Sequence, residues 1–262
     1  MAKKSIKIPA HIRLNKICEL LKNNNEVAVY QMAREFGVSK VTIHRDLRRL
    51  ENDGHLRRTR GGAQPSEKME FEFDFAVRRS ANQRAKKAIA TEALKLIKPG
   101  QKLILDTGTT TLELAYKIKE MDDLTIVTPS LAVASVLQFS TGIETVLLGG
   151  VIKKGSCDLT GVVTENVLDM FMVDIAFQGA DGIASNGEMY NSDIRIARVD
   201  QKMRKRAQKI CVLCDSSKIG RTKLAANGSL AQVNTLITDN GIEAKYIKAF
   251  KKMGTKVIAV KA

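Results

Sequence analysis

The sequence has few of the features that mark secreted, membrane-spanning or disulfide-rich proteins. Its four cysteines are spread over 262 residues, too scattered for a disulfide framework, which favours a reducing compartment. The first residues carry positive charge but no apolar stretch long enough for a signal peptide. No run approaches the roughly 18 to 20 apolar residues of a membrane helix. We therefore expect a cytoplasmic protein with no membrane partner.

Positive charge is unevenly distributed along the chain. The sequence holds 43 Lys and Arg against 28 Asp and Glu, a net charge of +15. Residues 1–64 contain 14 basic and 6 acidic side chains, a net charge of +8 on a quarter of the chain. A local excess of positive charge is typical of a surface that neutralises nucleic-acid phosphates. The length suits one small and one large domain, so the small basic part is expected to bind nucleic acid.

The basic part has the pattern of a helix-turn-helix. Apolar residues at helical spacing predict a first helix from Leu14 to about residue 23 and a second over Tyr30–Phe36. Gly37 permits a left-handed turn, and Ser39 is a good N-cap for a third helix over Lys40–Asn52. This order of helix, tight turn and capped helix predicts a DNA-reading unit.

The third predicted helix has an apolar side and a basic side. At 100° per residue, Ile43, Leu47 and Leu50 share one narrow stripe that must pack inward. An apolar back with an arginine-rich front fits the DNA major groove, where Arg45 is placed for a bidentate contact with guanine. A solvated basic helix face is the alternative. The candidate DNA contacts on this helix and on the hairpin, or wing, predicted over residues 55–62 are Ser39, Lys40, Val41, Thr42, His44, Arg45, Arg48, Arg49, Arg57, Arg58 and Arg60.

Residues 64–80 are predicted to be a linker. Phe71, Phe73 and Phe75 alternate with acids, which favours an extended segment packed on a neighbour; a partner-binding segment is the alternative. Beyond residue 83 helical and strand patterns alternate, which predicts a mainly parallel sheet covered by helices. Strands are expected over 102–106, 125–128, 144–148, 175–179, 209–214 and 235–238.

The loop after the first of these strands has the composition of an anion site. Residues 106–111 read DTGTTT, so backbone N–H groups near Gly108, the hydroxyls of Thr109 and Thr110 and a helix N-terminus would meet there. Asp106 would repel a phosphate and is better suited to accept hydrogen bonds from sugar hydroxyls. For this loop taken alone, simple helix capping is the alternative.

Three further loops, over 149–153, 179–182 and 215–218, also follow predicted strands. Their glycines permit close backbone approach, Asp181 offers acceptors, and Lys153 or Lys218 supplies a cation for a phosphate. Ligands of open α/β sheets bind beyond the carboxyl ends of the strands. These loops are therefore expected to converge on one crevice.

Residues 36–63 (FGVSKVTIHRDLRRLENDGHLRRTRGGA) resemble the DNA-reading signature of the DeoR family of bacterial regulators of sugar metabolism. The later loops, in the same order, resemble the effector domain of that family, which has the fold of ribose-phosphate isomerases. The resemblance covers essentially the whole chain and implies a double-stranded DNA operator and a phosphorylated sugar effector. The effector-binding residues expected from the loops and the resemblance are Asp106, Thr107, Gly108, Thr109, Thr110, Ser130, Gly149, Gly150, Lys153, Asp181, Gly182 and Lys218.

The chain departs from the family pattern at several of these places. The family usually has arginine at the position of His44 and histidine at that of Arg60, so no operator sequence is transferred. Pro129 stands where asparagine is preferred and Lys153 where arginine is usual, and residues 187–196 match poorly. The ligand is therefore expected to be atypical, with loss of ligand binding as the alternative.

Two other kinds of site are weaker interpretations of the same sequence. Asp181 has the chemistry of a base for sugar-phosphate isomerisation, but the isomerase motif continues with an acid where Gly182 stands, and no histidine lies in the second domain. Cys211 and Cys214 have the spacing of a redox or zinc pair. Residues three apart on a strand point to opposite faces, so two core residues are expected instead. No catalytic residue, cofactor or metal is predicted.

The sequence thus predicts an α/β protein with a winged helix-turn-helix over 1–63, a linker over 64–80 and a sugar-phosphate-sensing domain over 81–262. An oligomer, a dimer or tetramer, would present its recognition helices to half-sites roughly 34 Å, or a multiple, apart. Effector binding would separate these helices and weaken operator binding, as in a repressor. An activator of the same architecture is the alternative, and an isomerase-like enzyme is the alternative from another class.

Overall fold

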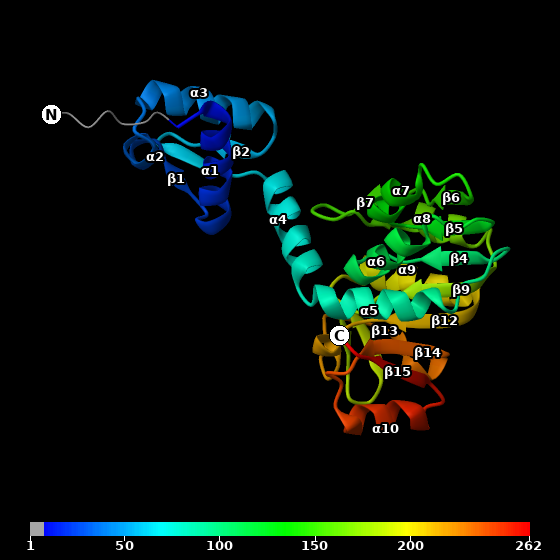
Figure 1. Cartoon of the computed structure of the whole chain (residues 1–262). Coiled ribbons are helices and arrows are strands. Elements are labelled where there is room, and N and C mark those ends of the chain that lie inside the picture. The colour runs from blue at the N-terminus through cyan, green and yellow to red at the C-terminus, as the bar shows by residue number, and fades with distance from the viewer. Residues whose placement is uncertain (1–7) are drawn as a thin grey trace. The chain divides into compact units, whose positions relative to one another are not determined.

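The computed structural model describes residues 8–262, apart from the side chains of residues 70–74. The chain divides into two compact units, Met1–Arg78 and Arg79–Ala262 (Figure 1). Among the described residues, no helix is both long and apolar enough to span a membrane.

The smaller unit combines three helices with a small antiparallel sheet. The helices are α1 (Ala10–Asn23), α2 (Val29–Phe36) and α3 (Lys40–Asn52). The bounds expected for the third helix are confirmed. The strands β1 (Val27–Ala28), β2 (Leu56–Arg58) and β3 (Gly62–Pro65) lie in the order β1-β3-β2, and β2 and β3 form the predicted wing.

The core of this unit lies between the helices and the sheet. Ile43 and Leu47 are fully buried and Leu50 nearly so, which confirms the predicted apolar stripe on α3. Gly62 is required where β3 crosses β1, because a Cβ atom there would lie 1.8 Å from the carbonyl oxygen of Val27. The buried cluster consists of Ile17, Leu21, Val27, Val29, Met32, Ala33, Phe36, Ile43, Leu47, Leu50, Leu56, Ala63 and Met69.

The segment expected to be extended is a helix, α4 (Glu67–Ser80). The prediction was wrong because three phenylalanines at period two are a short signal, whereas Ser66 begins the helix by accepting a hydrogen bond from the backbone N–H of Met69 (3.1 Å). Glu, Lys, Met, Ala and Arg in the segment favour the helical state. The side-chain packing expected of Phe71 and Phe73 lies outside the described residues.

The larger unit is built on a seven-stranded sheet in which every pair is parallel. Its strands lie in the order β15-β14-β12-β9-β4-β5-β6. Six of them confirm the predicted strands within two residues, and the edge strand β15 was not foreseen. Their bounds are Lys102–Leu105 (β4), Leu124–Thr128 (β5), Ile143–Leu147 (β6), Val173–Gln178 (β9), Ala207–Leu213 (β12), Thr235–Asp239 (β14) and Lys256–Val260 (β15).

Helices cover both faces of this sheet. From β4 the chain runs outward through β5 to β6, then returns to β9 and runs the other way, so right-handed crossovers place the two sets of helices on opposite faces. Each central strand is buried on both sides; Leu103, Ile104 and Leu105 of β4 have no exposed surface. The helices are α5 (Gln83–Leu94), α6 (Thr109–Ile118), α7 (Leu131–Leu137), α8 (Val162–Leu168), α9 (Ile194–Lys205) and α10 (Ala244–Lys252), with short 3-10 turns over Ser216–Lys218 and Leu230–Gln232.

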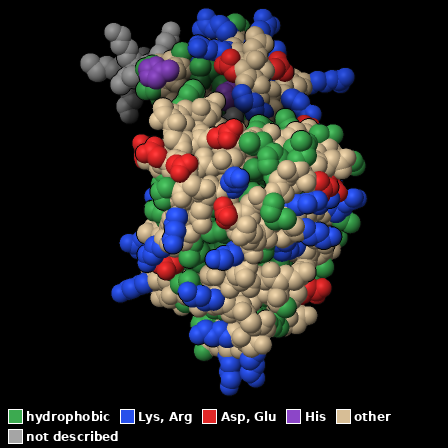
Figure 2. Space-filling model, turned by 90° about the vertical axis from the view of Figure 1, so that its right-hand side faces the viewer, with side chains coloured by type: hydrophobic (Ala, Val, Ile, Leu, Met, Phe, Trp, Pro, Cys, Tyr) green, Lys and Arg blue, Asp and Glu red, His purple; other side chains and the backbone are tan. Residues whose placement is uncertain are grey.

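Two smaller antiparallel sheets extend the carboxyl side of the large sheet. A hairpin of β7 (Val151–Ile152) and β8 (Leu159–Thr160) follows β6, and a three-stranded sheet is formed by β10 (Gly182–Ile183), β11 (Glu188–Asn191) and β13 (Ala225–Ser229). On the face shown in Figure 2, basic side chains of the larger unit are interspersed with acidic and apolar ones.

Candidate DNA-reading surface and sensor site

Gly37 and Ser39 fix the start of α3, the predicted recognition helix. Gly37 adopts the left-handed conformation (φ +63°) that ends α2. Ser39 then caps α3 by accepting a hydrogen bond from the backbone N–H of Thr42 (3.2 Å). The turn and the cap together fix where α3 starts and therefore which side chains it presents.

The outer face of α3 is the one expected from the sequence. Arg45, Arg48 and Arg49 are exposed and make no ion pair among the interactions recorded for the described residues. Lys40 lies 5.4 Å from the centre of the Tyr30 ring on α2. The remaining predicted contacts on this face are exposed Ser39, Val41 and His44 and half-buried Thr42.

The wing is attached to the end of α3. The backbone N–H of Arg58 donates to Oε1 of Glu51 (3.0 Å), which holds β2 against the helix. The side chains of Arg57, Arg58 and Arg60 are exposed. The wing therefore carries three cationic side chains, two on β2, which is held against α3, and Arg60 in the turn that follows.

A buried ion pair behind the reading face was missed at the sequence level. Nε and Nη2 of Arg13 on α1 donate to Oδ2 and Oδ1 of Asp46 on α3 (2.5 and 3.0 Å), and both side chains are about 95% buried. Nη1 of Arg13 also donates to the carbonyl of Ile8 (2.8 Å). The hydrogen bonds to Asp46 raise the pKa of Arg13, so the guanidinium is charged and fixes α3 against α1.

The candidate sensor site lies at the carboxyl ends of five adjacent strands. Because β12, β9, β4, β5 and β6 are neighbours and parallel, the loops that follow them lie along the same edge of the sheet. That these loops converge on one crevice stays a prediction. The strand order reverses between β4 and β9, and ligands of open α/β sheets bind at such a reversal.

Asp106 joins the two loops at this reversal. Its Oδ2 accepts a hydrogen bond from the backbone N–H of Gly179 after β9 (2.9 Å), and its Oδ1 accepts one from the N–H of Thr107 (2.6 Å). Burial of the carboxyl and the nearby charge of Asp200 raise its pKa well above the ordinary range. The structure thus gives Asp106 a part in holding the loops after β4 and β9 together; its expected contact with sugar hydroxyls stays a prediction.

The loop after β4 has the backbone expected of an anion site. Gly108 begins α6 with φ +120° and ψ +162°, a conformation that only glycine adopts readily. Gly108 is exposed, Thr107 and Thr109 are half-buried and Thr110 is buried. The first N–H groups of α6 point outward from this turn, as at any helix N-terminus.

Ser130 and the glycine pair follow the next two strands. Ser130 is buried and caps α7 by accepting a hydrogen bond from the N–H of Val133 (3.2 Å). Gly149 and Gly150 are exposed, but a Cβ atom at Gly150 would lie 2.8 Å from the carbonyl oxygen of Thr160. Gly150 is therefore needed for the chain's own packing, whether or not a ligand approaches it.

The remaining predicted residues lie in three different local settings. Asp181 accepts hydrogen bonds from the backbone and side chain of Ser192 (both 2.8 Å). Gly182 is buried, and a Cβ atom there would lie 2.6 Å from the carbonyl oxygen of Arg221. Lys153 in the β7–β8 hairpin and Lys218 after β12 are half-buried. The two lysines follow β6 and β12, the outermost of the five strands.

A buried polar network lies near Asp106 and was not foreseen. Oδ2 of Asp200 on α9 accepts hydrogen bonds from the side-chain amides of Asn191 (2.9 Å) and Asn227 (3.0 Å), while Oδ1 has no partner. Arg204, one turn further along α9, donates to the side chain of Gln178 (3.0 Å) at the end of β9. Burial raises the pKa of Asp200 to about 7 although Arg204 and Asn191 lower it.

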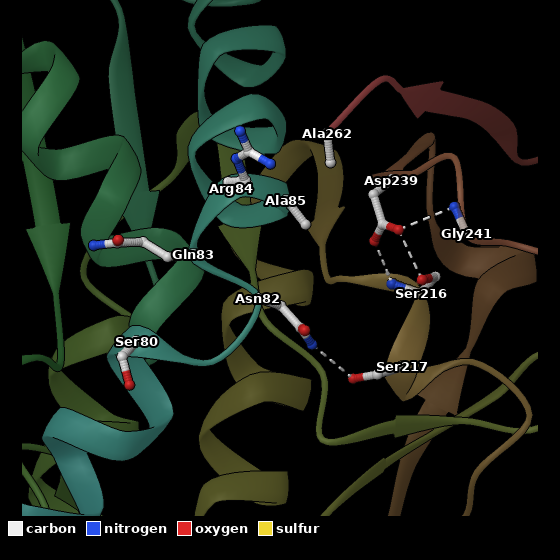
Figure 3. A pocket seen from close by; sticks show the side chains of 10 residues that line it. All are labelled: Ser80, Asn82, Gln83, Arg84, Ala85, Ser216, Ser217, Asp239, Gly241 and Ala262. Carbon is white, nitrogen blue, oxygen red and sulfur yellow. Dashed lines mark hydrogen bonds between the residues drawn. The ribbon is translucent and has the colours of Figure 1, made fainter.

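A groove of about 700 Å³ lies at the same edge of the sheet, beyond the Lys218 loop. It is lined by the start of α5 and by the loops after β12 and β14 (Figure 3). Asn82 points toward Ser217, whereas Asp239 is occupied by the N–H and hydroxyl of Ser216 and the N–H of Gly241. The carboxylate that lines the groove is thus already hydrogen-bonded within the protein, and Arg84 is the other charged side chain of the lining.

Cys211 and Cys214 are buried in and directly after β12. Burial raises the pKa of both thiols far above the ordinary value, which disfavours the thiolate that metal binding and redox exchange require. Both cysteines therefore pack as small core residues, as expected.

Comparison with known proteins bears on both units. Residues 13–68 match the model of the DeoR-like helix-turn-helix domain, and residues 81–240 match that of the DeoR C terminal sensor domain. The chain is 32% identical to the lactose phosphotransferase system repressor of Lactococcus lactis, over 93% of this chain and 96% of the relative. It is 28% identical to the L-fucose operon activator of Haemophilus influenzae, over 86% and 90% of the two chains.

Among solved structures, ribose 5-phosphate isomerase A from Methanocaldococcus jannaschii aligns with a TM-score of 0.41 and 23% identity, over 53% of this chain and 55% of the isomerase. This similarity is too low to bear on activity. The family models instead cover the reading unit and most of the larger unit, in the order in which the structure places them. The chain belongs to the DeoR family of helix-turn-helix transcriptional regulators.

Proposed function

We propose that this regulator represses genes of carbohydrate metabolism and that a phosphorylated sugar, bound at the carboxyl edge of the large sheet, lowers its affinity for the operator. The observation that carries the proposal is the capped helix α3, whose exposed arginines lie opposite a buried apolar stripe. Such a helix is suited to the major groove. The sensing half is supported by the five loops that lie along one edge of the sheet in the same chain, among them the glycine- and threonine-rich loop after β4.

The relatives support the choice of genes. One is named a repressor of the lactose phosphotransferase system and another an activator of the L-fucose operon. Sugar operons are therefore the expected targets. Because one relative is named a repressor and the other an activator, an activator of the same architecture is the alternative. Transcription from a reporter gene, measured with and without the protein, distinguishes repression from activation.

The proposed effector contacts follow from the chemistry of the loops. Backbone N–H groups at the start of α6 would bind phosphate oxygens, and Lys153 or Lys218 would supply the neutralising charge. Asp181 would accept hydrogen bonds from sugar hydroxyls. The protein would then do no chemistry on the sugar, and absence of turnover when sugar phosphates are incubated with the full chain is the expected result.

Operator affinity measured across a panel of sugar phosphates tests the sensing half. We expect one phosphorylated sugar to weaken operator binding by about 5- to 150-fold, and the same sugar without phosphate to have no effect. Lys218→Ala should raise the required effector concentration about tenfold or more because a charged phosphate contact is lost. Lys209→Ala is the matched control, since Lys209 is an exposed lysine near the opposite end of the same strand. An operator affinity that no sugar phosphate changes would contradict the sensing proposal.

Different roles are expected for two arginines of α3. Arg45→Ala should weaken binding to the cognate operator by about 1–3 kcal/mol and relax base preference, since Arg45 is proposed to contact a guanine edge. Arg48→Ala should weaken binding to all DNA sequences alike. Because one phosphate contact is lost, the slope of log affinity against log salt concentration should become shallower by about one. Fluorescence anisotropy on cognate and random duplexes at several salt concentrations measures both effects. Equal losses on the two duplexes for both variants would refute this division of roles.

A further inference from the structure

Positive charge is concentrated a second time at the end of the chain. Residues 201–262 contain 14 Lys and Arg side chains and 3 acidic ones, a net charge of +11. Residues 65–200 contain 15 basic and 19 acidic side chains, and residues 1–64 carry a net charge of +8. The last 62 residues are therefore more basic than the segment that holds α3 and the wing. A net charge of one sign opposes compact folding by self-repulsion, and a negatively charged partner would relieve it.

Few of these cations are neutralised within the protein. Lys245 contacts Glu243 (2.7 Å), and Lys202 and Arg206 share the carboxylate of Asp169. The other two acidic side chains of the segment lie in the loops after β12 and β14, where they accept hydrogen bonds from backbone N–H and serine hydroxyl groups. Most of the positive charge of residues 201–262 therefore has no ion-pair partner among the described residues.

Helix α10 gathers four of these cations on one side. At 100° per residue they lie within an arc of about 120°. The opposite side of the helix carries Phe250, which is fully buried in the core of the larger unit. At the lower end of this unit in Figure 2, where Figure 1 places α10, Lys and Arg side chains gather. The four exposed residues, which we call the lysine face, are Lys245, Lys248, Lys251 and Lys252.

The chemistry of the lysine face suits the phosphate backbone of duplex DNA. Lysine is a compact point charge that contacts phosphates without reading bases. A helix that inserts into a membrane surface must leave its apolar side free, whereas the apolar side of α10 is buried. Single-stranded nucleic acids are bound by stacking bases on exposed aromatic rings, but the nearby ring of Tyr246 is half-buried and packs against Phe250 (5.9 Å between centroids).

We propose that the lysine face of α10 binds phosphates of the DNA duplex that flanks the operator. The inference rests on DNA reading by α3, which tethers the larger unit of the same chain to the same DNA. Tethering raises the effective concentration of the flanking duplex, so a weak second contact adds to the total affinity. Such contacts carry no sequence information, and they increase the dependence of binding on salt.

Operator binding by the full chain without effector, measured on two duplexes, tests the proposal. The short duplex holds the operator alone, and the long duplex adds random sequence of about 20 base pairs, roughly two helical turns, on each side. We expect the native chain to bind the long duplex at least about tenfold more tightly at low salt. The slope of log affinity against log salt concentration should be steeper by about 2 to 3, since each neutralised phosphate contributes about 0.9.

The test variant combines Lys248→Gln, Lys251→Gln and Lys252→Gln. It leaves Lys245 in place because that side chain is paired with Glu243, and glutamine is nearly as good a helix former as lysine. The variant should bind the short duplex like the native chain and lose both the tighter binding and the steeper slope on the long one. Arginine at the same three positions should retain them, because the charge is kept.

A matched control removes the same charge elsewhere on the larger unit. It combines replacement by glutamine of three exposed lysines of α5, the turn after it and β4, which make no ion pair among the interactions of the described residues: Lys87, Lys98 and Lys102. Its net charge equals that of the test variant, so an effect of total charge alone would appear in both. We expect the control to prefer the long duplex as the native chain does.

Far-UV circular dichroism and thermal unfolding verify that the variants fold. A folded test variant that keeps the native preference for the long duplex would overturn the proposal, as would a native chain that binds both duplexes equally. Single-stranded DNA that competes for the lysine face as well as duplex DNA does would overturn the choice of partner. Failure of the native chain to bind the short duplex would instead contradict DNA reading by α3, so the two failures are distinguishable.

Discussion

Replacing Arg13 by alanine is expected to lower the free energy of unfolding of the smaller unit by about 3–5 kcal/mol and to abolish operator binding. Arg13 holds the carboxylate of Asp46 through two hydrogen bonds in a nearly solvent-free position between α1 and α3. Without the guanidinium, that carboxylate stays buried with no opposite charge. The expected loss is a large part of the roughly 5–15 kcal/mol by which ordinary domains are stable.

Amide hydrogen exchange of the full chain measures the loss of stability separately for each unit. Amides of α1 (Ala10–Asn23) and α3 (Lys40–Asn52) should lose protection in the variant, whereas those of the large sheet should not change. Arg34→Ala is the matched control, because Arg34 is an exposed arginine on α2 outside the predicted DNA contacts; surface substitutions usually change stability by less than about 0.5 kcal/mol.

A double replacement separates the cost of an isolated charge from the value of the pair. Arg13→Met combined with Asp46→Leu removes both charges and fills the space with apolar groups, and such exchanges are often neutral or stabilising. The double variant should therefore recover most of the lost protection. If it is as unstable as Arg13→Ala, the buried charge is not the cause of the loss.

The parts of the fold that the sequence could predict are those in which several local signals agree. The bounds expected for helix α3, about Lys40 to Asn52, agree with the structure because Gly37, the cap at Ser39 and the apolar stripe all mark the same segment. Strands such as β4 and β9 were found because burial on both faces leaves a continuous apolar run. Edge strand β15 (Lys256–Val260) has a short apolar run as well, and it was missed although that signal is present; as an edge strand its residues are only half-buried or exposed.

The parts that could not be predicted depend on contacts between distant residues. Arg13 and Asp46 are 33 positions apart, and each resembles an ordinary surface charge in the sequence. Gly150 and Gly182 were assigned to a ligand, but the structure shows that both also allow close packing of the chain on itself. The strands β11 and β13 are far apart in the sequence and pair through a tertiary contact, and neither carries the apolar run of β4.

The network around Asp200 is the strongest example, and it leads to the second large effect. Its members come from β9, β11, α9 and β13, and no local pattern joins them. Asp200 is 99% buried, and its Oδ1 atom has no hydrogen-bond partner. Burial disfavours the ionised carboxylate, which raises the pKa of Asp200 in the folded protein to about 7.

This shift makes the stability of the larger unit depend on pH in a definite direction. In the unfolded chain the carboxyl loses its proton near pH 4, whereas in the folded chain it keeps the proton until about pH 7. Between these values the folded state binds more protons, so stability falls as pH rises. Over these three pH units, this one group lowers the free energy of unfolding by at most about 4 kcal/mol.

Asp200→Asn should remove that dependence. Asparagine is always neutral, and its carbonyl oxygen can still accept hydrogen bonds from Asn191 and Asn227. Relative to the native protein, the variant should therefore gain stability as pH rises from about 4 to 7 and show a constant difference above that range. Urea unfolding followed by tyrosine fluorescence suits the measurement, because Tyr116, Tyr190 and Tyr246 lie in the larger unit and the chain has no tryptophan.

Glu120→Gln provides the control for the loss of a carboxylate as such, since Glu120 is exposed beside Lys119, and its stability curve should parallel that of the native protein. A curve for Asp200→Asn that is also parallel would show that Asp200 ionises in the folded state without cost. The buried network would then hold its charge through Arg204, which lies one turn away on α9. If the two curves instead diverge between about pH 4 and 7, the carboxyl group of Asp200 stays protonated up to neutral pH, and below that pH it adds no negative charge near Asp106.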